Sequence, residues 1–498
     1  NRPETVTYPG PKTITYSYDA VGNRETLTDP DGGVTTYCYD SRGLLETLEN
    51  PYSEITTWQY DALGRVVTMT HANESTLAND YDDAGRLTAV RNLKSDSSVI
   101  SVFTYAYDSV GNRTGVEEAS GDLVTWSYDE IYQLTREQRS GANAYDVTYQ
   151  YDAVGNRETQ ETGGVTTTYS YDVANQLNTF EDDTGVTTFT YDANGNTETQ
   201  ETPAGALTTY TWDVENRMTK VELPASVINT ITLDGDGKRR TIEDSAGLRN
   251  LIWDAENILA ETDSGGTTEA AYTLAPEVYG SLLSQRRSGA TSFHHYDALG
   301  STNKLTDAAE ATEVEYLYKA FGEQSILSGS HSNPFTWVGQ LGYYRQADAS
   351  DYWVRARVMS PRIGRWISRD PDYVIRAYTK INSRISNYPY VSNSPVWVRD
   401  PGGLYSNCCP PGEDSLCDLR YMGCMECAAI THTHCKLDCG VPSFIGGLGT
   451  EAVCLIVGGT LGLIGGCPIA GIAVCTIIAG VITLPFWMYC TNKCDEAL

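Results

Sequence analysis

The chain has 498 residues with 65 acidic and 35 basic side chains, so its formal net charge is −30. A surface this acidic repels phosphate groups, and we therefore expect no nucleic acid among its partners. Tyrosine and glycine are abundant, at 34 and 45 residues, whereas phenylalanine is rare, at 8. Because tyrosine favours strands and glycine favours turns, this composition predicts a mainly β protein.

Charge and cysteine content both change along the chain, near residues 300 and 405. Residues 1–299 carry a net charge of −27, residues 300–404 carry +2 and residues 405–498 carry −5. All but one of the 13 cysteines lie in the last part. We therefore predict three regions with these boundaries: a repeat region, a core and a cysteine-rich tail.

The first region repeats a short motif about every twenty residues. Two copies, Tyr16–Arg24 and Tyr149–Arg157, share the run Tyr-Asp-Ala-Val-Gly-Asn-Arg. Alternating runs on both sides of a glycine-containing turn predict a β-hairpin. One hairpin cannot bury its own apolar face, so we expect the hairpins to stack into a continuous antiparallel sheet. The repeated aspartates are Asp19, Asp40, Asp61, Asp82, Asp108, Asp129, Asp152, Asp172, Asp192, Asp213, Asp234, Asp254 and Asp297.

Two functional interpretations of the repeat remain open beside the structural one. A row of tyrosines could bind sugars, and Asp234–Gly237 resembles the start of a calcium loop. The other ligand positions of such a loop are missing, and the four residues keep the register of the repeat. We therefore predict a turn there, and we expect neither a metal nor a cofactor.

This pattern resembles the YD-repeat, or rearrangement-hotspot (Rhs), family over roughly residues 10–404. The family includes bacterial Rhs toxins, the C components of insecticidal toxin complexes, and teneurins. The resemblance implies a spiralling sheet of antiparallel hairpins that forms a hollow shell or barrel.

The core region is similar to the Rhs-associated core, notably at His295–Asp307, at the Arg-Ala-Arg motif Arg355–Arg357, at Ser360–Pro371 and at Asp400–Leu404. In processed relatives this core plugs the shell and cuts the chain after its Asp-Pro-x-Gly-Leu motif. The resemblance therefore implies a cut between Leu404 and Tyr405.

The same resemblance assigns the catalytic roles to Asp370 and Asp400, with Arg369 beside them. Two neighbouring carboxylates cannot both ionise easily, so one can act as an acid while the other activates water. Arg369 could orient one of them through a charge-assisted hydrogen bond. The alternative is that these Asp-Pro pairs only start turns. The spacer at 373–386 looks longer than is usual for the family. At most, we expect self-cleavage and no turnover enzyme.

The tail predicts disulfide bonds, because 12 cysteines fall within residues 405–498. This density is typical of secreted proteins, so we expect a secreted or cell-surface location. Zinc is the alternative, since Cys424, Cys427, His432, His434 and Cys435 offer ligands, but a second Cys-x-x-Cys pair is absent. The disulfide candidates are Cys408, Cys409, Cys417, Cys424, Cys427, Cys435, Cys439, Cys490 and Cys494.

Residues 452–492 contain no charged side chain. We predict two helices from about 446 to 490, stapled by disulfides among Cys435, Cys439, Cys490 and Cys494. An apolar segment of this size must be covered by protein or by lipid, so a membrane hairpin is the alternative to a segment shielded by protein.

Two functions fit these features. In the first, the shell encloses or presents the tail as a toxin-like peptide. In the second, the chain is an extracellular scaffold, fibre or adhesin whose tail anchors it. The expected partners are accordingly the chain's own tail, further copies of the chain, or a cell-surface receptor.

Overall fold

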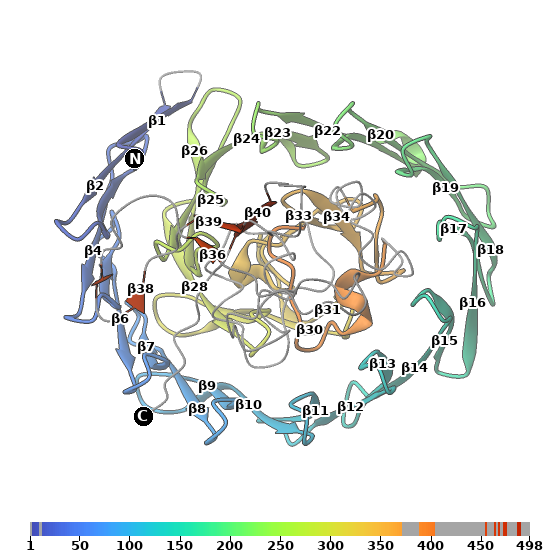
Figure 1. Cartoon of the computed structure of the whole chain (residues 1–498), viewed down its shortest axis with the longest axis horizontal. Coiled ribbons are helices and arrows are strands. Elements are labelled where there is room, and N and C mark those ends of the chain that lie inside the picture. The colour runs from blue at the N-terminus through green and yellow to red at the C-terminus, as the bar shows by residue number, and fades with distance from the viewer. Residues whose placement is uncertain are drawn as a thin grey trace. The chain divides into compact units, whose positions relative to one another are not determined.

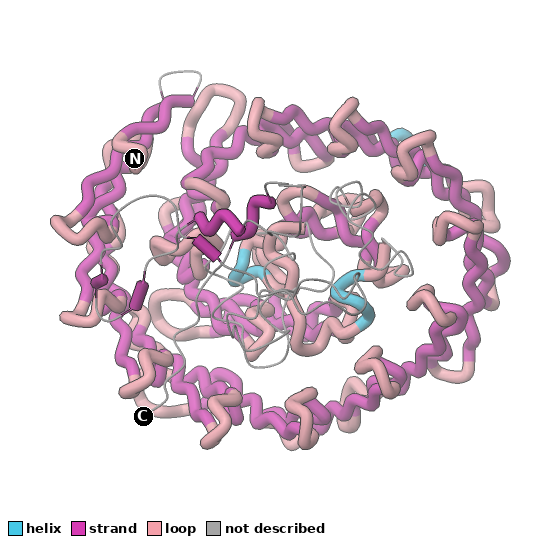
Figure 2. The backbone as a smooth tube through the Cα atoms, in the orientation of Figure 1, coloured by secondary structure: helices cyan, strands magenta, loops and turns pink. Residues whose placement is uncertain are grey.

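The computed structural model describes residues 2–8, 12–370 and 388–403, and the backbone of five short stretches between 454 and 489. The chain divides into two compact units, Asn1–Cys424 and Met425–Leu498. The first unit is built on one antiparallel sheet of 31 strands, in which each strand pairs with the next in the chain. Figures 1 and 2 show these strands, joined by short loops, with almost no helix.

The strands of this sheet follow one another in chain order. The first sixteen are β1 (Thr5–Tyr8), β2 (Lys12–Tyr18), β3 (Arg24–Thr28), β4 (Val34–Tyr39), β5 (Leu45–Glu49), β6 (Ile55–Tyr60), β7 (Val66–Thr70), β8 (Thr76–Tyr81), β9 (Leu87–Leu93), β10 (Val99–Tyr107), β11 (Arg113–Glu118), β12 (Leu123–Tyr128), β13 (Leu134–Arg139), β14 (Tyr145–Tyr151), β15 (Arg157–Thr162) and β16 (Val165–Tyr171). The others are β17 (Leu177–Asp182), β18 (Gly185–Tyr191), β19 (Thr197–Glu201), β20 (Leu207–Trp212), β21 (Met218–Leu223), β22 (Val227–Leu233), β23 (Arg239–Asp244), β24 (Gly247–Asp254), β25 (Asn257–Thr262), β26 (Thr268–Leu274), β27 (Leu282–Arg287), β28 (Ala290–Tyr296), β29 (Thr302–Thr306), β30 (Thr312–Tyr318) and β31 (Gln324–Gly329).

At every repeat except that of Asp254, the repeated aspartate builds the turn between two strands, as the sequence predicts. In the β6–β7 turn, Asp61 Oδ1 accepts hydrogen bonds from the backbone N–H groups of Leu63 and Arg65, both at 2.9 Å. Gly64 has a φ of +81°, a conformation that glycine adopts without strain. The segment at Asp234 forms the same turn, with its carboxylate bound by the N–H groups of Asp236 and Lys238.

The aromatic residue of each Tyr-Asp pair has a second role, which the sequence did not predict. The hydroxyl of Tyr60 donates to the carbonyl of Leu45, 2.7 Å away, at the start of a strand in the preceding hairpin. Each pair therefore combines a turn-forming aspartate with a link to the hairpin before it. Equivalent links are made by Tyr39, Tyr81, Tyr107, Tyr128, Tyr151, Tyr171, Tyr191, Tyr296 and Tyr318, and by the indole N–H groups of Trp212 and Trp253.

The sheet coils so that its later strands lie against the inner face of its earlier ones (Figure 1). The side chain of Asn92 on β9 donates to the carbonyl of Tyr296 at the end of β28, 3.1 Å away. The amide of Ala298 likewise donates to the hydroxyl of Tyr105 on β10. Within the described residues no pairing joins β1 to β31, so the sheet does not close into a barrel. The last strands pack inside the sheet rather than pairing with its first edge.

A smaller sheet follows the large one and lies inside the coil (Figure 1). It contains β32 (Tyr344–Arg345), β33 (Tyr352–Val354), β34 (Arg357–Ser360) and β35 (Arg365–Trp366). The side chains of Tyr352 and Trp366 form a core with Leu134, Val147 and Tyr149 of the wall. The described part also contains the short 3₁₀ helices η1 (Pro224–Ser226), η2 (Gly339–Leu341) and η3 (Tyr390–Asn393). The change of charge near residue 300 falls within the large sheet, which continues to Gly329.

In the second unit the prediction of two helices from about 446 to 490 is not supported. The described stretches of this segment are short strands, and β39 pairs antiparallel with both β36 and β40. β-Branched and aromatic residues dominate the two longer strands, and such residues favour extended backbone. The strands are β36 (Cys454–Leu455), β37 (Leu463–Ile464), β38 (Cys467–Pro468), β39 (Ile472–Cys475) and β40 (Phe486–Tyr489).

Candidate functional site

The last described segment of the first unit forms a turn that packs against the hairpin of β33 and β34. The amide of Gly403 donates to the carbonyl of Asp400, 3.1 Å away. Gly403 has a φ of +66°, and a Cβ atom at this position would lie 2.1 Å from the carbonyl oxygen of Val354. Only glycine therefore allows the turn to approach the hairpin this closely.

Three consecutive hairpin residues bind three consecutive carbonyls of this turn. The guanidinium of Arg355 donates to the carbonyl of Pro401, 2.5 Å away. The amide of Ala356 donates to the carbonyl of Gly402, 3.3 Å away, and the Nε of Arg357 donates to that of Gly403. We call residues 355–357 the carbonyl clamp. It holds the backbone that leads to Leu404 in one register.

Arg357 also joins the two aspartates for which the sequence predicts a catalytic role. Its Nη2 lies 3.2 Å from Asp400 Oδ2, and its Nη1 lies 3.8 Å from Asp370 Oδ2. The side chains of both aspartates are 4% exposed and that of Arg357 is 1% exposed. The guanidinium carbon lies 4.1 Å from the ring centre of Trp366. A single buried cation thus contacts both carboxylates.

The buried Tyr343 holds the backbone of Asp400, and a second buried tyrosine, Tyr390, bonds its hydroxyl. The hydroxyl of Tyr343 donates to the carbonyl of Asp400, 2.9 Å away, and lies 3.1 Å from its amide nitrogen and 2.8 Å from the hydroxyl of Tyr390. Burial raises the pKa of Tyr343 well above its ordinary value, and the nearby Asp400 carboxylate raises it further. Burial likewise raises the pKa of Tyr390. Both hydroxyls therefore stay protonated and act as hydrogen-bonding groups.

Arg369, the arginine for which the sequence predicts a role, packs beside the shell wall. A Cβ atom on Gly195, in the β18–β19 turn, would lie 2.4 Å from Arg369 Cδ and 2.8 Å from the hydroxyl of Tyr388. That hydroxyl donates to the carbonyl of Gly195, 2.8 Å away. The arginine that contacts both carboxylates is Arg357, which belongs to the Arg-Ala-Arg motif of the core.

Several predicted site residues lie outside the described part of the chain. They include the bond between Leu404 and Tyr405 and the spacer at 373–386. Cys38 is exposed and free. In the described ranges no group of three or more His, Cys, Asp or Glu side chains could hold a metal ion. No helix in these ranges is long and apolar enough to cross a membrane. The disulfide candidates Cys408, Cys409, Cys417, Cys424, Cys427, Cys435, Cys439, Cys490 and Cys494 likewise lie outside the described residues.

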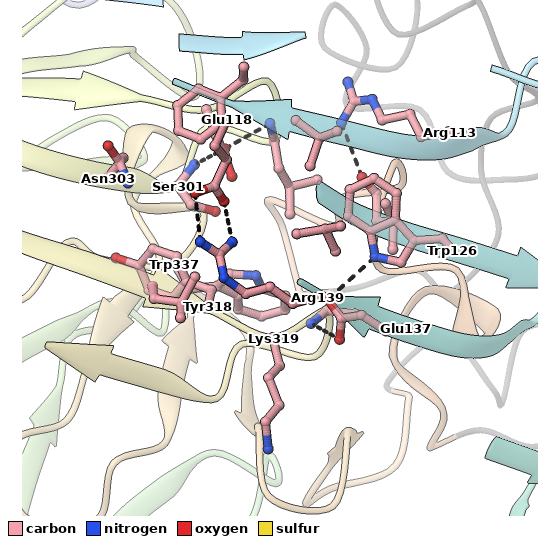
Figure 3. Close-up of a pocket in the computed structure, with 18 of the residues that line it drawn as sticks. Arg113, Glu118, Trp126, Glu137, Arg139, Ser301, Asn303, Tyr318, Lys319 and Trp337 are labelled. Atoms are coloured by element: carbon pink, nitrogen blue, oxygen red, sulfur yellow. Dashed lines mark hydrogen bonds and ion pairs between the residues drawn. The ribbon is translucent and has the colours of Figure 1, made fainter. Parts of the chain in front are cut away.

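A second feature, absent from the sequence-based expectations, is a cavity of about 90 Å³ between β10–β14 and β29–β30 (Figure 3). Glu137 lies beside it and accepts hydrogen bonds from the amide of Ala320 at 2.9 Å, the indole of Trp126 at 3.3 Å and the hydroxyl of Tyr145 at 3.1 Å. Burial raises the pKa of Glu137 to about 7. All three donors fix this carboxyl in place, so Glu137 joins the two layers of the coil.

Comparisons with known proteins agree with this architecture. The Teneurin YD-shell family model matches residues 3–138, and the RHS Repeat model matches residues 191–227. In these residues the chain is thus similar to the YD-shell and RHS-repeat families, in keeping with the repeated hairpins of its sheet.

The chain is similar to parts of much longer proteins. The tRNA3(Ser)-specific nuclease WapA of Bacillus spizizenii and the tRNA nuclease WapA of Bacillus subtilis are each 27% identical to it over 323 residues, which cover 63% of this chain and 11% of the relative. Its fold resembles the crystal structure of TcdB2-TccC3, with a TM-score of 0.64 and 18% identity over 79% of this chain and 22% of that one. The Photorhabdus luminescens Tc holotoxin pore gives a TM-score of 0.59, 18% identity and coverage of 79% and 21%. The chain thus spans about a tenth of the length of the two WapA relatives.

Proposed function

We propose that this chain is the carrier shell of a secreted, toxin-like protein, and that its core cuts the chain after Leu404 to free residues 405–498. The proposal rests on one contact above all, that of the Asp370 and Asp400 carboxylates with the guanidinium of Arg357. Two carboxylates near one buried cation favour a pair in which one group is ionised and the other protonated. The toxins and nucleases among the similar proteins support the toxin-like role.

The proposed cut is a hydrolysis that uses both carboxyl groups. One carboxylate takes a proton from water as the water oxygen attacks the carbonyl carbon of Leu404. The other carboxyl gives its proton to the nitrogen of Tyr405, and the C–N bond breaks. The products are a carboxylate at Leu404 and an amine at Tyr405. Arg357 stabilises the ionised carboxylate, and its Nε binds the carbonyl of the preceding Gly403.

The freed segment is proposed to be a disulfide-linked apolar peptide that protein shields from water. Its 41 uncharged residues, 452–492, would aggregate if they were left exposed. We expect bridges among Cys435, Cys439, Cys490 and Cys494, and peptide mapping under non-reducing conditions tests this. Free thiols at these four positions would refute the bridges.

The nuclease activity in the names of the WapA relatives is not part of the proposal. The match covers 11% of those proteins, and a net charge of −30 disfavours binding to phosphates.

Intact-mass measurement of the reduced protein tests the cut. We expect two masses, for residues 1–404 and 405–498, from the wild-type chain, and a single full-length mass from Asp370→Asn or Asp400→Asn. Asp236→Asn is the matched control, because Asp236 is exposed in a wall turn. A folded wild-type chain that stays whole between about pH 4 and pH 8 would contradict self-cleavage.

A further inference from the structure

Arg355 connects the segment before the proposed cut with the wall of the shell. Its Nη1 donates to the carbonyls of Pro401, 2.5 Å away, and Leu341, 3.0 Å away. On the wall side, its Nε donates to the carbonyl of Glu256 at 2.8 Å, and its Nη2 lies 3.3 Å from Asn257 Oδ1. The two wall partners belong to the turn between β24 and β25, about 100 residues earlier in the chain. One guanidinium therefore binds three separate parts of the unit.

The backbone of Arg355 has an unusual conformation that these contacts maintain. Its φ is +44°, in the left-handed region that side chains other than glycine rarely adopt. Val354 pairs with Arg357, so Arg355 and Ala356 form a two-residue hairpin loop. A residue persists in this region only where its surroundings fix it. The four hydrogen bonds of the guanidinium supply that constraint.

The backbone of Pro401 depends on the guanidinium of Arg355 more than the backbones of Gly402 and Gly403 depend on their own hydrogen-bond donors. Proline has no backbone N–H, so its carbonyl is its one backbone group that can form a hydrogen bond. Gly402 and Gly403 are held by the amide of Ala356 and the side chain of Arg357. Without Arg355, the Pro401 carbonyl would lose its bond and the clamp would lose its link to the wall, which should weaken the two bonds that remain.

We infer that Arg355 is a positioning residue for the proposed cut: it sets the register of residues 401–403 and makes that register depend on the folded β24–β25 turn. This inference rests on the proposed function. Its consequence is an order of events, in which the shell wall folds first and the chain is cut afterwards. Among the described residues Arg355 contacts the carbonyl of Pro401, three residues before Leu404, so its proposed effect passes through the position of the backbone.

The rate and place of the cut test this role. Arg355→Lys keeps the charge but lacks the planar fork that reaches several acceptors at once. We expect Arg355→Lys and Arg355→Ala to cut about 10- to 100-fold more slowly, because small displacements of reacting groups have effects of this size. The pH dependence should stay that of the wild type, because Arg357 still contacts both carboxylates. Arg357→Lys, in contrast, should shift the pH profile.

Two further variants distinguish a positioning role of Arg355 from a general loss of folded structure. Asn257→Ala removes the wall partner of Arg355 Nη2, together with the bonds of Asn257 to Glu277, Val278 and Gly280, and should also slow the cut. Arg362→Lys is the matched control, since its side chain is 54% exposed and lies 3.9 Å from Asp182; it should cut at the wild-type rate. Cutting at the wild-type rate and at the same bond in Arg355→Ala would overturn the inference.

Hydrogen exchange gives a measurement that does not depend on cleavage. In an uncut Asp370→Asn background, the amide of Ala356 should be protected by its bond to Gly402. Adding Arg355→Ala should speed its exchange at least about tenfold, while amides of β14 and β15 stay unchanged. If the wild-type chain is never cut, the proposed function fails. If protection of the Ala356 amide still depends on Arg355 in that case, the carbonyl clamp itself is supported. If protection is unaffected by Arg355→Ala, the clamp itself is refuted.

Discussion

The guanidinium of Arg24 lies 2.5 Å from the carboxylate of Asp254, although 230 residues separate them in the chain. This ion pair joins β3 of the outer layer to the end of β24 in the inner layer. The hydroxyl of Tyr16 donates to the same carboxylate, 3.0 Å away. The side chains of Arg24 and Asp254 are 14% and 5% exposed, so water screens their attraction little.

We expect loss of this pair to loosen the contact between the layers. Asp254→Ala leaves Arg24 without its partner in a buried position, and such losses cost about 3–5 kcal/mol. The unfolding midpoint in urea should fall accordingly. The exposed pair of Arg136 and Asp146 is the control, because Asp146→Ala should change stability by less than about 1 kcal/mol. Equal effects of the two substitutions would show that the pair does not join the layers.

A second prediction concerns the link between consecutive hairpins. Tyr60→Phe removes the hydroxyl that donates to Leu45 and keeps the ring, so it should cost about 0.5–1.5 kcal/mol. Asp61→Ala removes the acceptor in the turn and should cost about 1 kcal/mol more. The control is Tyr52→Phe, at a tyrosine 41% exposed, and thermal unfolding measures all three. No difference between Tyr60→Phe and Tyr52→Phe would contradict the role of the hydroxyl.

The periodic features of the fold were predictable because they are local. A hairpin, its turn aspartate and its glycine lie within a few residues, and the repeat presents them many times. Asp254 shows the limit of this reasoning. It occupies the repeat position, yet it is the last residue of β24, directly before a two-residue loop, and its carboxylate contacts Arg24 and Tyr16 instead. The sequence repeat does not indicate which strands form the inner layer of the coil and which form the outer layer, because that arrangement depends on long-range packing.

The candidate site was predicted in part for the same reason. Asp370 and Asp400 stand in recognisable motifs, but the arginine that contacts both is 13 residues before one and 43 before the other. The Arg-Ala-Arg motif was visible in the sequence, and only the folded β33–β34 hairpin shows that it faces the Asp400 turn. The tail has no repeat to guide prediction, and its β-branched and aromatic residues outweighed the apolar length that suggested helices.

The third prediction concerns stability near neutral pH. Burial raises the pKa of Glu137 from 4.5 to about 7, so the folded protein keeps this proton at pH values where the unfolded chain releases it. Stability should therefore fall as the pH rises from about 4.5 to 7, by up to about 3 kcal/mol from this group. Glu137→Gln keeps a neutral side chain and should flatten that part of the curve. Asp351, whose pKa burial also raises to about 7, acts in the same direction, so Asp351→Asn serves as the comparison.

The last prediction has the opposite sign and concerns the histidines between the layers. His71, after β7, has its ring centre 5.6 Å from that of His295 on β28. Burial lowers the pKa of His71 to about 4 and that of His295 well below its ordinary value. Each histidine is therefore neutral when folded, whereas the unfolded chain takes up protons below about pH 6.5. Contact between the layers should weaken as the pH falls from about 6.5 to 4.

His71→Gln removes one of these groups and should reduce the loss of stability on acidification. Thermal unfolding of the wild type and of His71→Gln at pH 7 and pH 4 gives the comparison, with Glu137→Gln measured alongside because Glu137 has the opposite dependence. His331 is the matched control, because it is partly exposed and lies 3.7 Å from Glu313, which opposes the effect of its burial on its pKa. His331→Gln should change the acid dependence less than His71→Gln does. An identical slope in His71→Gln and the wild type would show that this buried ring does not govern the acid sensitivity of the coil.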